Sequence, residues 1–372
     1  MIQPVDLKPV RVVASGCRTA LGNAGETCAA LLRGQRALEF QPVLGPDGGE
    51  LVPLALAADR VPGGSAAPDW LPCVDALAAE VPPGPWGSPT HPVFFTSSNF
   101  GVGSLYAFSR DNDRRHLAFG TPHAMVDFLR RRLGWGTNVA IASHACVSAH
   151  IGLLLASRLL QSGMAARALV FSFDFVSPFV AGGFHSLKIL NNAMPAPYAD
   201  RPSGSIGLGD GAAFAVLSLE DSGSPLLSAQ SLHNEMHHST ANRADGAGFA
   251  ACFSPIAAAA AGRRLWIKGH GTGTLEAGRL EAQALDRLFP DSPLVSWKGS
   301  IGHTLGSCGL VELAVVLEAM AAGRAPGTVG CEGPRFAENV ATGAFSIDDR
   351  DGVLLTSNAF GGAHAAFLVS HD

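Results

Sequence analysis

Apolar positions along this chain form short continuous runs, separated by longer stretches in which apolar residues have helical spacing. Such short runs, bounded by glycine, proline or polar residues, are typical of buried strands. The predicted strands cover residues 10–16, 93–96, 138–142 and 168–173, and the predicted helices cover residues 26–32, 124–133 and 148–161. This alternation of strand and helix predicts an α/β fold with a parallel sheet covered on both faces.

The stretch of residues 148–161 is apolar nearly all round, which predicts a helix buried in the centre of the protein. Gly163 closes it, and the strand of residues 168–173 follows. The strand of residues 138–142 leads directly into Cys146. Cys146 is therefore expected at a junction between a strand and a helix.

A second copy of this plan follows later in the chain. The apolar residues 294–297 lead through Gly302 and His303 into an apolar helix of residues 309–317, and a predicted hairpin at residues 209–217 is echoed by residues 361–369. Two related halves explain this repetition. We predict an N-terminal half of residues 1–222 and a C-terminal half of residues 223–372, joined as one integrated unit because no Pro/Ser-rich or charged linker divides them.

Composition restricts the class of protein. The 372 residues are 47% hydrophobic and 15% charged, which indicates a compact globular chain. The net charge of -5 argues against nucleic acid or an anionic membrane as a partner. The chain has no apolar run of roughly 18 residues, and its start, with Asp6 and Lys8, lacks a secretory pattern. A cytoplasmic location is expected.

The cysteines form an odd set without paired spacing, so neither a disulfide framework nor a zinc ribbon is indicated. They are Cys17, Cys28, Cys73, Cys146, Cys252, Cys308 and Cys331. Most are expected to be small buried hydrophobes. Cys146 differs because a helix N-terminus favours the thiolate and lowers the pKa of a thiol, which would make it a nucleophile. The alternative is a buried structural cysteine.

Two histidines stand in glycine-framed segments, His270 in residues 270–274 and His303 after Gly302. Glycine lets the backbone approach a ligand closely, and a neutral imidazole can donate a hydrogen bond to a carbonyl oxygen that becomes negative. Either histidine alone could be structural. Together they favour an oxyanion site.

Lys298 and Glu312 flank His303 within largely apolar sequence. An unpaired buried charge costs several kcal/mol, so we expect these two side chains to pair with each other or with the imidazole. The alternative is an exposed lysine and a half-exposed glutamate. His144, Cys146 and His150 are candidate metal ligands, but no acidic ligand accompanies them, so no metal is expected.

In combination these motifs resemble the β-ketoacyl synthases, the decarboxylating condensing enzymes of the thiolase fold. The resemblance rests on Cys146, the segments of residues 270–274 and 298–303, Glu312, and residues 357–362, in that order along the chain. It implies a thiolase-like fold in which two βαβαβαββ halves form α-β-α-β-α layers. It also implies the carbon–carbon bond formation that this family performs on thioesters.

The implied reaction is a decarboxylative Claisen condensation during fatty acid, polyketide or polyene elongation. Cys146 would accept an acyl group from an acyl carrier protein, and His270 and His303 would hold the thioester carbonyl of a malonyl unit while carbon dioxide leaves. Initiating synthases usually have Asn where His303 stands, so the resemblance favours an elongating enzyme with a Cys-His-His triad. Lys298 and Glu312 match further family positions at the site.

The resemblance also assigns residues around the reacting atoms. Phe360 matches the gating phenylalanine, and its backbone N–H and that of Cys146 match the second oxyanion site. Thr272 and Thr274 match positions that contact the phosphopantetheine arm of the carrier protein. This arm carries the substrate, and no tightly bound cofactor is expected. The chain departs from the family pattern at Val147, at Gly278 and in a shortened Phe360 loop, which bears on pocket shape.

The implied partners are an acyl carrier protein and a second subunit. Arg114 and Arg115 lie near the place where family members present a basic patch to the carrier, although a solvated charge run explains them equally well. Dimerisation is expected along residues 138–142, either with a second copy or with a homologous ketosynthase or chain-length factor. Two other functions stay open: a non-catalytic partner subunit like a chain-length factor, and a thiolase or CoA-dependent condensing enzyme.

Overall fold

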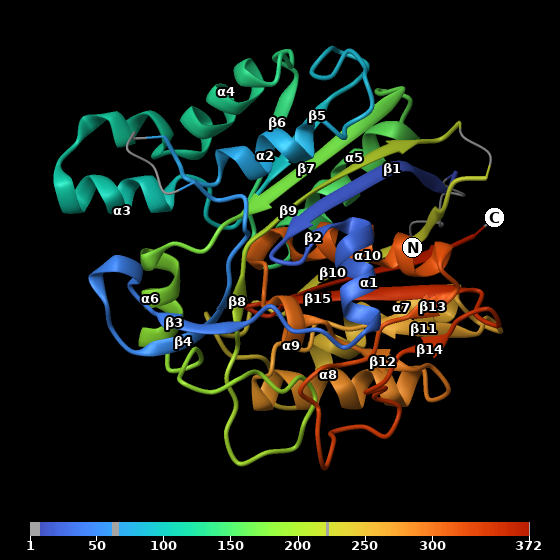
Figure 1. Ribbon diagram of the computed structural model, residues 1–372. Helices are drawn as coiled ribbons and strands as arrows, with labels where there is room; N and C mark the ends of the chain where they lie inside the picture. The colour runs from blue at the N-terminus through green and yellow to red at the C-terminus, as the bar shows by residue number, and fades with distance from the viewer. Residues whose placement is uncertain (1–7, 62–66, 221–222, 372) are drawn as a thin grey trace.

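The computed structural model describes residues 8–61, 67–220 and 223–371 (Figure 1). Its helices are α1 (Ala24–Leu32), α2 (Leu71–Ala78), α3 (Val102–Asp111), α4 (Pro122–Arg132), α5 (Ser148–Gln161), α6 (Pro178–Ser186), α7 (Ala247–Ala259), α8 (Leu275–Leu288), α9 (Lys298–Ile301) and α10 (Cys308–Ala321), with 3₁₀ turns at Gly45–Asp47, Arg114–Phe119 and Leu305–Ser307. No helix among these residues is long and apolar enough to cross a lipid bilayer.

The main strands are β1 (Val10–Thr19), β5 (Val93–Thr96), β6 (Val139–Ala142), β7 (Arg167–Asp174), β9 (Gly211–Ser218), β10 (Leu226–Asn234), β11 (Leu265–Lys268), β12 (Leu294–Val295), β15 (Gly352–Ala359) and β16 (Ala363–Ser370). Shorter strands are β2 (Gly22–Asn23), β3 (Glu39–Pro42), β4 (Leu51–Ala55), β8 (Leu208–Gly209), β13 (Arg324–Ala325) and β14 (Phe345–Ser346). Most of the strands predicted from apolar runs are therefore present.

Strand order repeats between the two parts of the chain. The first part has the order β6-β5-β7-β9-β1, and the second has the order β12-β11-β15-β16-β10. In each part the first three strands are parallel and the last two run antiparallel to their neighbours. Pairing of Val10 with Leu227 joins the two parts edge to edge. The predicted division at residue 222 falls outside the described residues and stays a prediction.

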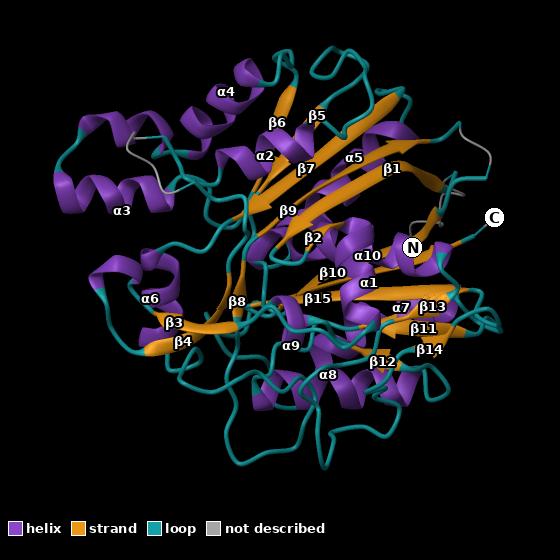
Figure 2. Cartoon of the chain, viewed as in Figure 1, coloured by secondary structure: helices purple, strands orange, loops and turns teal. Residues whose placement is uncertain are grey.

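Helices α5 and α10 form the central layer of the molecule. Helix α10 packs against α5, β1, β9 and β15, while α5 packs on β5 and β7. On the outer sides, α2 covers β1 and β9, and α7 covers β10 and β16 with α8 beside it (Figure 2). This five-layer arrangement confirms the predicted fold class, and it explains why α10 is apolar nearly all round, whereas α5 leaves Leu155 exposed.

Two predicted elements differ in detail. The run of residues 209–217 is one long strand, β9, preceded by the short β8, and not a hairpin. Asp210 separates these strands because its carboxylate accepts hydrogen bonds from Ala57 N at 2.9 Å and Val176 N at 2.7 Å. The run of residues 294–297 is a strand only at Leu294–Val295, since the chain turns at Trp297 to begin α9.

Candidate functional site

Cys146 lies between the end of β6 and the start of α5, as predicted, in a strained turn. Ala145, the residue before it, has φ +44°, a backbone conformation that residues other than glycine seldom adopt. Ser148 holds the turn: its hydroxyl donates to Ala145 O at 2.7 Å and accepts from His144 N at 2.8 Å. Strain of this kind is maintained only where the surrounding structure determines the backbone, which is typical of functional sites.

His303 is placed by the backbone of β8. Its N–H donates to Gly207 O at 2.7 Å, and its carbonyl accepts from Gly209 N at 3.0 Å. The two segments approach so closely that a Cβ on Gly209 would lie 2.0 Å from Ile301 O. Gly302, with φ +72°, makes the turn that follows α9. Glycines before and opposite His303 therefore fix where its ring points.

The thiol and the imidazole meet. Nε2 of His303 lies 3.1 Å from Sγ of Cys146, and Nδ1 of His303 accepts a hydrogen bond from Leu305 N at 3.2 Å. Because a neutral imidazole carries one proton, a donor at Nδ1 places that proton on Nε2. His303 therefore presents an N–H to the sulfur, which stabilises a thiolate instead of removing the proton of the thiol.

His270 completes the group at the end of β11. Its ring centroid is 5.0 Å from that of His303, with the ring planes nearly perpendicular. The ligand atoms of Cys146, His270 and His303 all lie within 4.8 Å of one another. The three residues singled out in the sequence thus converge, although they come from three different segments.

Glu281, on α8, orients the His270 turn. Its buried carboxylate accepts hydrogen bonds from the backbone N–H groups of His270 at 2.8 Å and Gly271 at 2.9 Å, and from the side chains of Tyr198, Thr356 and Asn358. All five contacts are made by donors, so both oxygens of Glu281 act as acceptors. Sequence reasoning did not predict this role, because the partners of Glu281 are distant along the chain.

Burial controls protonation at this site. It lowers the pKa values of His270 and His303 well below the usual range, and the positive charge of Lys298 adds to the effect, so both rings are neutral at pH 7. Burial also raises the pKa of Cys146 above that of a free thiol. The expected lowering by the helix N-terminus is wrong for the resting thiol, because desolvation outweighs it and Cys146 precedes the first residue of α5 by two positions.

Two lysines share one buried carboxylate behind the histidines. Oε1 of Glu312 lies 2.5 Å from Nζ of Lys298 and 2.8 Å from Nζ of Lys268. The predicted pairing of Lys298 with Glu312 is thus present, whereas Lys268 was missed. A charged residue at the end of the apolar strand at residues 265–267 was its only signal. Burial lowers the pKa of Lys268 to about 8. Burial also acts to lower the pKa of Lys298, but the negative charge of Glu312 outweighs this effect, so the pKa of Lys298 is raised.

The three reactive side chains line one cavity of about 80 Å³. Thr272 and Thr274 share its wall, with their hydroxyl oxygens 3.0 Å apart. Phe360 is 38% exposed, and its ring centroid lies 6.0 Å from that of Phe184, so two aromatic rings lie side by side in the lining. The remaining lining residues are Ile189, Ile206, Thr240, Asn242, Ala277, Asn358 and Ala359. Phe184, Thr240 and Asn242 were not predicted from the sequence.

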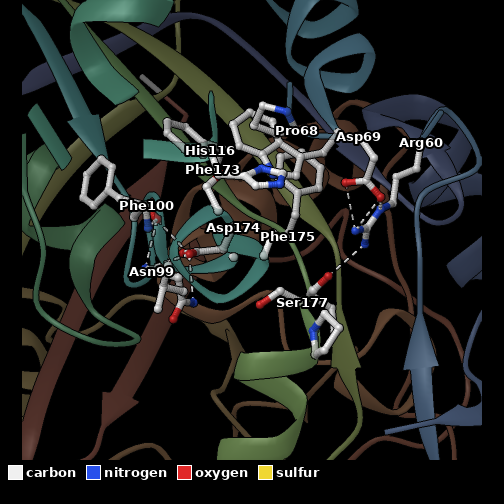
Figure 3. A pocket seen from close by; sticks show the side chains of 18 of the residues that line it. Arg60, Pro68, Asp69, Asn99, Phe100, His116, Phe173, Asp174, Phe175 and Ser177 are labelled. Atoms are coloured by element: carbon white, nitrogen blue, oxygen red, sulfur yellow. Dashed lines mark hydrogen bonds and ion pairs between the residues drawn. The ribbon is translucent and has the colours of Figure 1, made fainter. Parts of the chain in front are cut away.

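A second cavity of about 270 Å³ lies beside α3 (Figure 3). Phe173 and Phe175 line it together with Trp70, whose ring stacks on Phe175 at 5.0 Å. Asp174 projects from the same strand and accepts hydrogen bonds from Ser97 and Asn99, among others. Burial raises the pKa of Asp174 to about 6. None of the predicted site residues lines this second cavity.

Several other predicted residues lie apart from the site. Arg114 and Arg115 are exposed on the 3₁₀ turn at Arg114–Phe119, and Arg115 forms an ion pair of 2.5 Å with Asp113. His144 is exposed, whereas His150 is buried with its ring stacked 4.7 Å from Phe367. Within the described residues, the groups close enough to share a metal ion do not include the set of His144, Cys146 and His150.

Part of this chain matches a protein-family model, and about three fifths of it can be aligned with proteins of known function. The family model "Beta-ketoacyl synthase, C-terminal domain" matches residues 226–332. The 3-oxoacyl-[acyl-carrier-protein] synthase 2 of Coxiella burnetii is 28% identical over 261 residues, 63% of this chain and 62% of that protein. The tetracenomycin polyketide synthase ketoacyl synthase alpha subunit of Streptomyces glaucescens is 29% identical over 62% of this chain and 60% of its own length. The matches thus span about three fifths of these relatives.

Solved structures share the fold over almost the whole chain. The ishigamide ketosynthase/chain length factor has a TM-score of 0.81 at 17% identity, covering 98% of this chain and 99% of that one. A β-ketoacyl synthase from Burkholderia phymatum has a TM-score of 0.80 at 19% identity, covering 98% and 100%. This chain is therefore similar to β-ketoacyl synthases in sequence over about three fifths of its length and in its thiolase-like fold over almost all of it.

Proposed function

We propose that this protein is an elongating β-ketoacyl-[acyl carrier protein] synthase that performs a decarboxylative Claisen condensation. The observation that carries the proposal is the contact of 3.1 Å between Sγ of Cys146 and Nε2 of His303, with His270 in the same cavity. A nucleophile and two neutral hydrogen-bond donors around one space are the groups that acyl transfer followed by carbanion formation requires.

In the first step Cys146 attacks the thioester carbonyl of an acyl carrier protein. The sulfur gives up its proton and forms a bond to the acyl carbon, the bond between the acyl carbon and the carrier sulfur breaks, and the departing carrier thiolate takes up the proton that the Cys146 thiol released. The N–H at Nε2 of His303 stabilises the thiolate as it forms, since the resting thiol is neutral. Backbone N–H groups of Cys146 and Phe360 are proposed to receive the negative oxygen of the tetrahedral intermediate.

In the second step a malonyl thioester enters the same cavity. Loss of carbon dioxide leaves negative charge on its thioester oxygen, and the neutral rings of His270 and His303 donate hydrogen bonds to that oxygen. The resulting carbanion attacks the acyl carbon on Cys146. A carbon–carbon bond forms, the carbon–sulfur bond breaks, and the Cys146 thiolate is regenerated with release of a 3-oxoacyl thioester.

The buried lysines support this step. Two ammonium groups around the single carboxylate of Glu312 leave an excess of positive charge beside the histidines when both lysines are charged. This field keeps both imidazoles neutral and favours negative charge on a bound substrate. We propose that Lys298 and Glu312 act in this way, with Lys268 as a third member.

The substrate arm and the partners follow from the same proposal. We propose that Thr272 and Thr274, which line the cavity, contact the phosphopantetheine arm that carries the thioester, and that Phe360 gates the cavity together with Phe184. An acyl carrier protein and a second ketosynthase-like subunit are the proposed partners. The solved ketosynthase–chain length factor pair from Xenorhabdus doucetiae, with a TM-score of 0.78, shares the fold of this chain.

Intact-protein mass spectrometry tests the proposal. The chain is incubated with acyl carrier proteins bearing acyl groups of several lengths, and peptide mapping locates any added mass. We expect the acyl mass on Cys146, and none after Cys146→Ala. Cys308→Ala is the matched control, since Cys308 is also buried nearby, with its Sγ 3.3 Å from Cys146 O. This control is expected to acylate as the wild type does.

A non-catalytic partner subunit gives a different result. In that case no donor labels Cys146, either with the chain alone or with an added ketosynthase partner, while the partner itself becomes acylated. Labelling of another cysteine would contradict the assignment of the nucleophile and leave the family unchanged.

A further inference from the structure

A chain of hydrogen bonds runs from the His270 turn to a histidine behind the cavity. The amide nitrogen of Asn358 donates to Oε1 of Glu281 at 2.8 Å. The carbonyl oxygen of Asn358 therefore faces the other way, toward Nδ1 of His364 at 2.9 Å. Nδ1 of His364 must be the donor in this bond.

The other ring nitrogen of His364 also faces an acceptor. Nε2 lies 2.9 Å from Oε1 of Glu235, and both side chains are fully buried. Since Nδ1 already carries a proton, one more proton must lie between Nε2 and Oε1. It can sit on the imidazole or on the carboxyl group, and in either case one hydrogen bond joins the two side chains and the pair has no net charge.

Glu235 connects this histidine to two loops. Its second carboxylate oxygen accepts from Arg243 N at 2.7 Å, and its own backbone N–H donates to Gly362 O at 2.9 Å. The segment of residues 235–243 contains Thr240 and Asn242, and the turn before Gly362 contains Phe360. Thr240, Asn242 and Phe360 line the cavity that holds Cys146, and we call these three residues the rim.

The fit around Glu235 is tight. A Cβ on Gly248 would lie 2.0 Å from Oε1 of Glu235, and a Cβ on Gly362 would lie 2.8 Å from its Cβ. His364 packs its ring 4.2 Å from Phe249. Glycine at both positions lets the carboxylate reach the ring, so the contact between Glu235 and His364 is enforced by the surrounding packing.

We propose that Glu235 and His364 are a pair of positioning residues that holds the rim in place for the acyl-pantetheine substrate. The pair touches neither Cys146 nor a reacting atom. It joins the segment of residues 235–243, the Phe360 turn and, through Asn358 and Glu281, the His270 turn into one hydrogen-bonded unit. This inference rests on the proposed function for the identity of the substrate, but not for the geometry of the rim.

The test uses the full chain and an acyl pantetheine thioester as the donor to Cys146. Glu235→Ala removes the bonds to His364 and Arg243, and His364→Phe keeps the packing on Phe249 but removes both hydrogen bonds. We expect each change to raise KM about tenfold, as for loss of a buried hydrogen bond, and to alter kcat by less than about twofold. The physical reason is that a loosened rim must be ordered again each time substrate binds.

Glu235→Gln is the conservative rescue. Its amide oxygen can accept from Arg243 N while its amide nitrogen donates to Nε2 of a neutral His364, so KM is expected to stay within about twofold of the wild type. Glu50→Ala is the matched control, because Glu50 makes an exposed contact of 3.6 Å with His185 and should leave KM unchanged. Thermal melting verifies that each variant is folded.

Two results overturn the inference: an unchanged KM in folded Glu235→Ala and His364→Phe, or a Glu235→Gln variant as impaired as Glu235→Ala. A second readout separates it from the proposed function. Labelling of Cys146 by a bulky maleimide relative to iodoacetamide should rise severalfold in Glu235→Ala and not in Glu235→Gln. If the wild type accepts no acyl group but this ratio changes as expected, the proposed function fails and the role of the pair stands.

Discussion

At the scale of single residues, the protonation state of Cys146 is set by burial. Cys146 is 8% exposed and its pKa is raised by desolvation, so the resting protein holds a thiol. The N–H at Nε2 of His303 then stabilises the thiolate as negative charge develops on the sulfur of Cys146. The same burial keeps His270 and His303 neutral, which makes them donors that need no proton from solvent.

This assignment predicts the pH dependence of alkylation. Because the thiolate is the reactive form, the rate of Cys146 alkylation by iodoacetamide should rise about tenfold per pH unit from pH 6 to pH 9 without levelling off. Peptide mass mapping at each pH gives the rate for Cys146 separately from the other cysteines. A plateau below pH 8 would mean that the thiolate already dominates at neutral pH, against the assignment.

Asp174 gives a second prediction at this scale. Its folded-state pKa, raised to about 6 from 3.8 by burial, means that the folded protein binds its proton more tightly than the unfolded chain. Stability contributed by Asp174 is therefore present at low pH and is lost as pH rises through 6. Relative to Asp174→Asn, the wild type should lose about 2 kcal/mol of unfolding free energy between pH 4 and pH 7. Urea titrations of both proteins measure this difference, and a constant difference across the range would refute the shift.

At the scale of elements, the site is assembled where β6, β11 and α9 end. After each of these elements the chain turns, and one reactive residue lies in that turn. Close backbone packing at Gly209 and Gly302 allows the turn at His303. Behind them, the carboxylate of Glu312 on α10 ties β11 to α9 through Lys268 and Lys298. The elements are thus held together by charge as well as by apolar contacts.

Removing the shared carboxylate should be costly. Glu312→Gln leaves two buried lysines without a counter-charge, and we expect the free energy of unfolding to fall by about 3 kcal/mol or more. Lys268→Met should be milder, because Glu312 keeps Lys298 as its partner. Denaturant unfolding of both variants makes the comparison. Equal losses in the two variants would show that the shared carboxylate is not what stabilises the cluster.

The parts of the site that could be predicted from the sequence are those that depend on residues close together along the chain. A switch from an apolar strand to an apolar helix locates Cys146, and charges inside apolar sequence indicate that Lys298 and Glu312 must pair. The sequence did not predict Lys268, the five donors around Glu281 or the contact of Glu235 with His364. Those depend on which strand ends meet, and β10 and β16 are brought together only by the fold. Arg115 was a weak docking candidate because its neighbour Asp113 offsets its charge locally.

At the scale of the whole molecule, the packing of α5 against α10 joins elements that lie far apart in the sequence. A Cβ on Gly309 of α10 would lie 2.1 Å from Nδ1 of His150 on α5, so the helices meet there with no spare room. His150 is buried, stacks on Phe367 and has a pKa lowered to about 3 by burial, so it remains neutral. The contact therefore couples α5, α10 and β16.

A double-mutant cycle tests this packing. Gly309→Ala should destabilise the protein by about 1–3 kcal/mol, because the new methyl group meets a ring that is itself packed. His150→Ala removes the obstacle, so the double variant should recover at least about 1 kcal/mol relative to the sum of the single changes. Thermal or urea unfolding gives the coupling. Simple additivity would mean that the two helices do not meet at these residues.

We propose that Cys146, His270 and His303 act together on one pair of thioesters. It is tested most directly by measuring carbon dioxide released from a carboxyl-labelled malonyl carrier protein together with the 3-oxoacyl product. We expect one carbon dioxide per product, and we expect His270→Ala to abolish both while Cys146 still accepts an acyl group. Release of carbon dioxide and formation of product at wild-type rates in His270→Ala would contradict it.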